Sequence, residues 1–185
     1  RVVISYHLNV YCSDATSDIV MIYGGKHDSS PLVSVKKSGN GDDIIYGMGE
    51  TDTIDGGGGR DLIYGMGEED YIHGNTGNDV LYGGDRDDHL DGGEGRDVLY
   101  GGDGDDSILG EDGDDLLYGG SGNDYMYGHH STEFVMARDG VDFIFGEDGD
   151  DLLYGYSEND MLDGGEGRDF LHGDDGDDTL YGGLT

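Results

Sequence analysis

A nine-residue repeat constrains this chain more than any other feature. The repeat runs in unbroken phase from Ser38 to Tyr181, which makes 16 units, and residues 101–109 are a typical one: Gly-Gly-Asp-Gly-Asp-Asp-Ser-Ile-Leu. We number the positions of each unit from one to nine. A period this short has no room for the helix of a βαβ unit, and its apolar residues lack the spacing of an amphipathic helix. The repeat therefore predicts a coil of short strands separated by glycine-rich turns.

Two columns of the repeat keep their chemical character in every unit. Position six carries a carboxylate, from Asp43 in the first unit to Asp178 in the last, with Glu133 in the eleventh. Position eight carries Ile, Leu, Met or Val, from Ile45 to Leu180. A disordered acidic segment has no reason to keep both columns filled. The pattern therefore predicts an ordered coil with position eight in its interior.

The charge of the chain limits what it can bind. It contains 43 acidic and 9 basic side chains, a formal net charge of -34. Such a charge repels nucleic acid and anionic membranes and favours cations. No run of 18 apolar residues is present, so the sequence predicts no membrane-spanning segment. The single cysteine, Cys12, cannot form an internal disulfide, which leaves metal as the candidate staple for a secreted chain.

Positions seven and nine differ between odd and even units. Position nine is usually tyrosine in odd units, as in Tyr82 and Tyr100, and is more varied in even units. This 18-residue alternation predicts two nonapeptides per turn, about eight turns in all, and two unequal sheets. Position seven of the odd units is apolar throughout, for example Val80, Val98 and Leu116. We expect this odd face to pack on a second roll in a lateral homo-oligomer or fibre, on residues 1–37 or on a partner domain; the alternative is that tyrosine ladders stabilise the sheet alone.

The units match the pattern G-G-x-G-x-D-x-U-x, where U is a large apolar residue, and the chain resembles the RTX, or haemolysin-type calcium-binding, repeat family. The resemblance implies an all-β fold, a right-handed parallel β-roll (solenoid) with two nonapeptides per turn and Ca²⁺ in the turns. It also implies that G-G-x-G-x-D is half of a site. The aspartates and turn carbonyls of units n and n+2 would then enclose each ion.

The chemistry of the repeat suits calcium better than magnesium. Ca²⁺ accepts irregular sets of six to eight oxygen ligands, whereas Mg²⁺ requires a tighter octahedron. Stacked turns on two edges leave about 14 possible sites. The residues expected to hold calcium are the aspartates of position six and the glycines of position four: Asp43, Asp52, Asp61, Asp70, Asp79, Asp88, Asp97, Asp106, Asp115, Asp124, Asp142, Asp151, Asp160, Asp169 and Asp178, with Gly41, Gly59, Gly77, Gly95, Gly104, Gly113, Gly122, Gly140, Gly149, Gly167 and Gly176.

The interior column is too thin to fold the chain alone. One apolar side chain in nine residues buries little surface against the entropy lost when all nine are ordered. Stacked carboxylates add repulsion. We therefore expect the calcium-free chain to be unfolded or molten.

The repeat departs from its pattern in several units. Position four is Glu50, Glu68, Arg86, Ser131 or Glu158 instead of glycine, and four of these five lie in even units. Extra ligands are one interpretation of the glutamates, and a solvated acidic edge is the favoured one. The eleventh unit, residues 128–136, lacks glycine at positions two and four, so its sites are doubtful. Its pair His129-His130 is interpreted as a surface loop rather than a metal ligand set.

The chain divides into three parts on this pattern. Residues 1–37 are expected to form a divergent strand cap or the end of an upstream domain, 38–181 the sixteen-nonapeptide roll, and 182–185 the start of a further repeat. The strands within 1–37 could also continue the solenoid without calcium loops.

The leading function is a calcium-binding structural β-roll module of a secreted protein, folding outside the cell and serving as a scaffold. The alternatives are a self-assembling extracellular filament, adhesin or surface-layer component, and the non-catalytic repeat region of a secreted toxin or enzyme. No catalytic set is distinguishable from repeat residues, so no enzyme activity is expected. The resemblance also implies type I secretion and an extracellular or cell-surface location.

Overall fold

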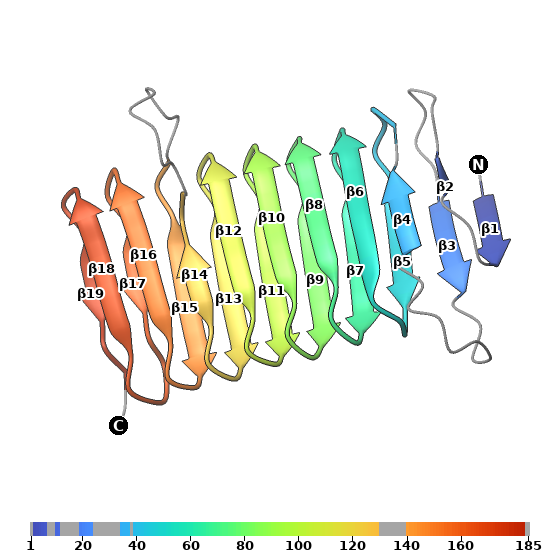
Figure 1. The fold of residues 1–185 in the computed structure, drawn as a ribbon. Helices are drawn as coiled ribbons and strands as arrows, with labels where there is room; N and C mark the ends of the chain where they lie inside the picture. The colour runs from blue at the N-terminus through green and yellow to red at the C-terminus, as the bar shows by residue number, and fades with distance from the viewer. Residues whose placement is uncertain are drawn as a thin grey trace.

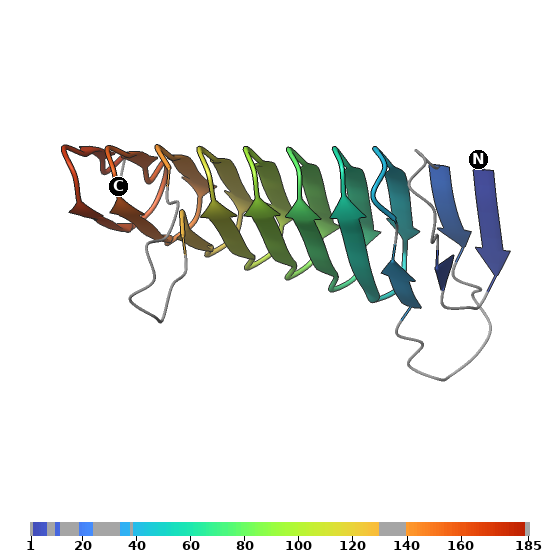
Figure 2. The same ribbon diagram turned by 90° about the horizontal axis from the view of Figure 1, so that it is seen from above.

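The computed structural model describes the backbone of four N-terminal stretches and both backbone and side chains of most of the repeat. The described residues are 2–6, 10–11, 19–23, 34–37, 39–129 and 140–183. Nineteen strands and no helix occur within these ranges. Figure 1 shows the strands following one another along one axis, with β1 and β19 at opposite ends. Figure 2 shows the same succession of rungs from above.

The strands form two parallel sheets, and successive strands alternate between them. The ten-stranded sheet contains β1 (Val2–Tyr6), β3 (Ile19–Tyr23), β5 (Ile44–Met48), β7 (Leu62–Gly67), β9 (Val80–Asp85), β11 (Val98–Asp103), β13 (Leu116–Ser121), β15 (Phe143–Asp148), β17 (Met161–Asp163) and β19 (Thr179–Tyr181). The nine-stranded sheet contains β2 (Val10–Tyr11), β4 (Ser34–Lys37), β6 (Asp52–Gly58), β8 (Tyr71–Thr76), β10 (His89–Glu94), β12 (Ser107–Asp112), β14 (Tyr125–Tyr127), β16 (Leu152–Ser157) and β18 (Phe170–Asp175). The predicted all-β parallel roll is confirmed.

The register shows two nonapeptides in each turn. Val98 pairs with Val80 on one side and with Leu116 on the other, a step of two units each time. The core is the single column at position eight, whose side chains from Ile45 to Leu162 are fully buried in the described units. Position eight points inward because side chains alternate along a strand, which leaves positions seven and nine outside.

One step of the stack is longer than all the others. Leu116 of β13 pairs with Phe143 of β15, and the backbone N–H of Asp115 donates to Asp142 Oδ1 at 2.8 Å across 27 residues instead of 18. The neighbouring row makes the same step, from Asp124 to Asp151. One nonapeptide is therefore extra between β14 and β15, and the prediction of strict alternation up to Tyr181 is wrong at this point. The repeat region, from β5 to β19, therefore makes about seven turns rather than eight.

Gly128 explains how the extra nonapeptide is accommodated. A Cβ on Gly128 would meet Asp142 Oδ2 and the carbonyl oxygen of Gly155, which is the environment of position one in the other units. Gly128 therefore belongs to the same turn as Gly140 and Asp142, with the additional residues inserted inside that turn. The acid of this turn is Asp142, which accepts the hydrogen bond from the N–H of Asp115. Ser131 and Glu133, like His130, lie outside the described residues.

The longer step exchanges the sheets of all later units. Phe143 and Met161 join the ten-stranded sheet, while Leu152 and Phe170, predicted for the odd face beside Val80, lie in the nine-stranded sheet. The two faces expected from odd and even units are therefore correct only up to β14.

The backbone of β1 to β4 continues both sheets. Ile19 of β3 pairs with Ile44 of β5, and Ser34 of β4 pairs with Asp52 of β6. The division of the chain at residues 37 and 181 stays a prediction.

Candidate metal sites

The position-six aspartates form two rows, one on each edge of the roll. We call the turns that lead into the ten-stranded sheet the first edge, with Asp43, Asp61, Asp79, Asp97, Asp115, Asp142, Asp160 and Asp178. We call the turns that lead into the nine-stranded sheet the second edge, with Asp52, Asp70, Asp88, Asp106, Asp124, Asp151 and Asp169. The structure thus brings together all the aspartates that the sequence predicted as ligands, in rows that cross every turn.

From Asp61 and Asp70 onward, one carboxylate oxygen of each position-six aspartate accepts a backbone hydrogen bond from the preceding turn. Asp79 Oδ1 accepts a hydrogen bond from the N–H of Asp61 at 2.7 Å, and Asp97 Oδ1 accepts one from the N–H of Asp79 at 2.7 Å. The aspartates from Asp43 to Asp160 in these rows are buried, with Asp79 and Asp97 each 1% exposed, and Asp169 and Asp178 are partly exposed. These bonds tie each turn to the next and hold the carboxylate groups in a fixed orientation.

The second oxygen has no such partner in many of these aspartates. It is buried and accepts no hydrogen bond in Asp61, Asp79, Asp88, Asp97, Asp106, Asp124, Asp151 and Asp169. A buried carboxylate oxygen without a partner is costly, and a bound cation removes that cost. The rows therefore have the chemistry of cation ligands.

Burial shifts the protonation of these acids. Loss of hydration raises the pKa of Asp61 to about 8 and that of Asp97 to about 7, against the lowering effect of the backbone hydrogen bond. Repulsion from Asp79 raises both further. The same cause raises the pKa of Asp88 and Asp124 to about 7. Without a cation these groups therefore take up protons at a higher pH than ordinary carboxyl groups do.

Glycine at position one provides space beside the carboxylate. A Cβ on Gly74 would lie 2.5 Å from the carbonyl oxygen of Gly92 in the next turn and 2.6 Å from Asp79 Oδ2. Two oxygens from successive turns therefore converge on a space that any larger residue would fill. Glycine at this position serves close approach rather than positive φ.

Glycine at position four lies where a carbonyl of the preceding turn faces it. Gly95 has φ of 151°, which residues with a Cβ rarely adopt. A Cβ built on Gly95 would lie 2.6 Å from the carbonyl carbon of Gly77 and much closer to its carbonyl oxygen. The C=O bond of Gly77 therefore points end-on into the gap between the turns. Backbone carbonyls of this kind are ligands that Ca²⁺ accepts.

The donor set suits Ca²⁺ and consists of carboxylates and backbone carbonyls. Within residues 39–129 and 140–183, no group of three or more His, Cys, Asp and Glu side chains is arranged to hold a metal ion. An ion bound by the side chains of these residues would need backbone carbonyl oxygens to complete its coordination sphere. The assignment of the individual aspartates and glycines as ligands stays a prediction.

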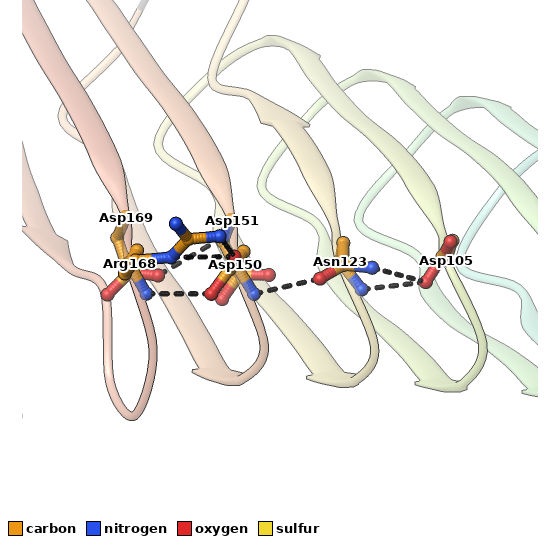
Figure 3. A network of polar contacts seen from close by, with 6 residues as sticks. All are labelled: Asp105, Asn123, Asp150, Asp151, Arg168 and Asp169. Carbon is orange, nitrogen blue, oxygen red and sulfur yellow. Dashed lines mark hydrogen bonds and ion pairs between the residues drawn. The ribbon is translucent and has the colours of Figure 1, made fainter. Parts of the chain in front are cut away.

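A ladder of hydrogen bonds between position-five residues lies outside the row of aspartates on the second edge, and it was not predicted from the sequence. The N–H of Asn123 donates to Asp105 Oδ1 at 2.8 Å, that of Asp150 to Asn123 Oδ1 at 3.0 Å, and that of Arg168 to Asp150 Oδ1 at 3.0 Å (Figure 3). Arg168 also forms an ion pair with Asp150. The Asp and Asn residues at position five were the sequence signal that could have predicted this ladder. These bonds link turns without any metal.

His129 differs from its prediction. It is 8% exposed, and its Nδ1 lies 3.6 Å from Glu111 Oε2 and 3.9 Å from Asp112 Oδ1. The interpretation of the histidine pair as a surface loop is therefore wrong for His129, because this residue belongs to the turn that contains Gly140.

Comparison with known protein families assigns most of the chain to one of them. A family model that spans four copies of the RTX calcium-binding nonapeptide repeat matches residues 38–72, 64–99, 73–108, 100–129, 132–162 and 154–184. No curated protein matches the chain. Across the part that the structure describes, there is no helix that could cross a membrane.

Proposed function

The chain belongs to the family of RTX calcium-binding nonapeptide repeats, and from this premise we propose that it is a structural β-roll module of a secreted protein that folds on binding calcium outside the cell. The observation that carries the proposal is the pair of rows of buried aspartates with an unbonded oxygen, such as Asp79 and Asp97. The repeat itself is a non-catalytic one, and we propose no enzyme activity for these residues.

In this proposal the two carboxylate oxygens of each aspartate have different roles. Oδ1 holds the turn in register through the backbone N–H of the preceding turn, as at Asp97. Oδ2 and the carbonyls of positions one and four face the space between turns. Bound Ca²⁺ would supply positive charge there, against a net charge of -34. Extracellular calcium modules work at roughly 10⁻⁴–10⁻³ M, so the chain would stay unfolded at the lower concentration inside a cell.

Circular dichroism during a calcium titration tests this function. We expect β structure to appear with Ca²⁺, to disappear with EDTA and to be absent at the same concentration of Mg²⁺. A chain with equal β content with and without calcium, or one that responds equally to magnesium, would contradict the proposal.

A second proposal is that rolls assemble laterally through the ten-stranded sheet, and a continuous aromatic column favours it. Tyr46, Tyr64, Tyr82, Tyr100 and Tyr118 stack with ring centroids 4.7–5.1 Å apart, and Phe145 continues the column at 5.2 Å from Tyr118. Beside it runs an apolar column that includes Leu116 and Phe143, and Phe143 is 44% exposed. Large apolar faces of this kind are often interfaces.

Sedimentation in saturating calcium separates the two proposals. Lateral assembly predicts particles larger than one chain, and substitution of Val80, Val98 and Leu116 by Lys should return them to monomers. Monomeric wild-type protein at high concentration would rule out assembly and leave the first proposal unaffected.

A further inference from the structure

A hollow on the outer face of the nine-stranded sheet lies between two exposed aromatic side chains. Tyr125 of β14 pairs with Leu152 of β16, and Leu152 pairs with Phe170 of β18, so these position-seven residues follow one another on three neighbouring strands. Tyr125 is 50% exposed and Phe170 is 67% exposed. The hollow has a volume of about 330 Å³ and is lined by Tyr125, Asp150, Asp151, Leu152, Arg168 and Phe170.

The longer step of the stack creates this order of side chains. A step of 18 residues after β14 would place Phe143 beside Tyr125, so that two aromatic residues would be neighbours. The step of 27 residues places Leu152 there instead, and Phe143 pairs with Leu116 in the other sheet. A short aliphatic side chain therefore stands between two aromatic ones.

The hollow has the width of one stacked ring. Neighbouring strands lie about 4.8 Å apart, so the two strands that carry the aromatic residues are separated by about 9.6 Å. In the position-nine column of the same three strands, rings fill every place: Tyr154 lies 5.3 Å from Tyr127 and 4.6 Å from His172. At position seven the middle place holds Leu152, whose side chain is shorter than a tyrosine ring. One ring-shaped place is therefore left open above Leu152.

The edge of the hollow offers hydrogen-bond donors and acceptors. Arg168 Nε donates to Asp150 Oδ2 at 3.1 Å, which holds the guanidinium group beside the hollow (Figure 3). The ion pair uses only part of the five N–H donors of a guanidinium group. Hydrogen bonds from the side chain and the backbone of Arg168 also lower the pKa of Asp150, so its carboxylate is an ionised acceptor at neutral pH.

The charges around the hollow favour a neutral ligand. The net charge of -34 repels anions, and the guanidinium group of Arg168 repels a cation that enters between the rings. A pyranose ring is neutral, has apolar C–H faces that stack on aromatic rings, and carries hydroxyl groups around its edge that donate and accept hydrogen bonds. Its faces match Tyr125 and Phe170, and its edge matches Arg168 and Asp150.

We propose that the hollow between Tyr125 and Phe170 binds one pyranose ring of a neutral saccharide, with Leu152 beneath the ring and the pair of Arg168 and Asp150 at its edge. This binding function is separate from the calcium rows and depends on them only because the roll must be folded. A contact with a single sugar ring has a dissociation constant of roughly 1 mM.

An NMR titration of the full chain in saturating calcium tests the site. The neutral probes are cellohexaose, chitohexaose and maltohexaose, and we expect at least one of them to bind. Tyr125→Ala and Phe170→Ala should each weaken its binding about tenfold, because each removes one stacking face. Leu152→Tyr should abolish binding, because a third ring fills the open place. Circular dichroism in calcium verifies that each variant keeps the β content of the wild type.

Tyr71→Ala is the matched control. Tyr71 stands at position seven of β8 in the same sheet and is 38% exposed, but its ring stacks on His89 at 4.7 Å and it does not line the hollow. This variant should bind the saccharide as the wild type does. Equal losses of affinity in Tyr71→Ala and Tyr125→Ala would overturn the site.

Two further probes decide the class of ligand. Tetramethylammonium represents a cation and phenol a plain aromatic ring, and binding of either one in place of all three saccharides would overturn a pyranose site. A chain that folds with calcium and binds no saccharide would overturn this inference and leave the proposed function intact. A chain without β structure in calcium would contradict the proposed function instead.

Discussion

At the scale of single residues, the position-six aspartate combines two roles in one carboxylate. Its Oδ1 accepts a backbone hydrogen bond from the preceding turn, whereas its Oδ2 is left for a ligand. An asparagine keeps an oxygen for the first role and loses the negative charge needed for the second. Substitution at this position therefore separates the register of the roll from its affinity for calcium.

We predict that Asp97→Asn weakens calcium binding without changing the fold at saturating calcium. The midpoint of the calcium titration should rise about tenfold, or ~1.4 kcal/mol, because one anionic ligand is lost. Circular dichroism against calcium concentration measures it. Asp85→Asn, an exposed change of the same charge at position three, is the control and should leave the midpoint nearly unchanged. Equal midpoints in both variants would contradict a ligand role for Asp97.

The raised pKa values of the same aspartates predict an unusual pH dependence for the calcium-free chain. Asp61 has a pKa of about 8 and Asp97 of about 7 in the roll, above the ordinary value of 3.8 expected in the unfolded chain. The roll binds protons more tightly, so their stabilising effect is complete below about pH 4 and is lost as pH rises through 6–8. Calcium should reverse this trend, because it binds the ionised form.

Circular dichroism in EDTA between pH 4 and pH 8 checks the sign. We expect β structure to be greatest at acidic pH and to decrease toward pH 8. Light scattering must be measured in parallel to detect aggregation near pH 4, because the isoelectric point of the chain is about 4.1. A soluble calcium-free chain whose β content increases with pH would contradict the prediction.

At the scale of the strand, side chains that stack along the roll connect each strand to its neighbours in the same sheet. Tyr100 lies between Tyr82 at 4.7 Å and Tyr118 at 4.8 Å, with ring planes within 4° of parallel. We predict that Tyr100→Ala lowers the free energy of unfolding by about 1–3 kcal/mol in saturating calcium, because it removes two aromatic contacts.

Tyr100→Phe is the matched variant, since it keeps both ring contacts and removes only the hydroxyl. Chemical denaturation at constant calcium compares the two. If Tyr100→Ala and Tyr100→Phe lose the same stability, the ladder of rings contributes nothing and the apolar face has another role.

At the scale of the whole molecule, the longer step between β13 and β15 decides how the roll is assembled. Deletion of residues 130–138 joins His129 to Asp139 and restores a turn with Gly128, Gly140 and Asp142 in the phase of the repeat. We predict that this deletion keeps the β content and the number of calcium ions, because no described strand is removed and a shorter loop costs less entropy to close.

Deletion of residues 101–109 is a control of the same length. It removes residues 101–103 of β11 and 107–109 of β12, and with the latter most of the pairing of β12 with β10 and all of its pairing with β14, so it should lose β content and calcium ions. Circular dichroism and calcium counting on both variants give the comparison. An equal loss in the two deletions would show that the nonapeptide in the longer step belongs to the stack.

Much of this protein could be predicted from the sequence because its pattern is local. A carboxylate at position six and an apolar residue at position eight, two residues apart, must point to the same side of an extended strand, as Asp97 and Leu99 do. The same unit contains the carboxylate and the backbone carbonyls that would form half of a calcium site. Fold class, core column and acid rows follow from this spacing.

Only the tertiary structure decided which units stack on which. A step of 18 or of 27 residues preserves the phase of a nine-residue repeat, so the sequence pattern is the same for both. The choice depends on contacts between distant turns, such as Asp115 with Asp142 and Tyr118 with Phe145. The burial of His129 depends on such contacts as well, because it is set by the neighbouring turn and not by the repeat in which the residue lies.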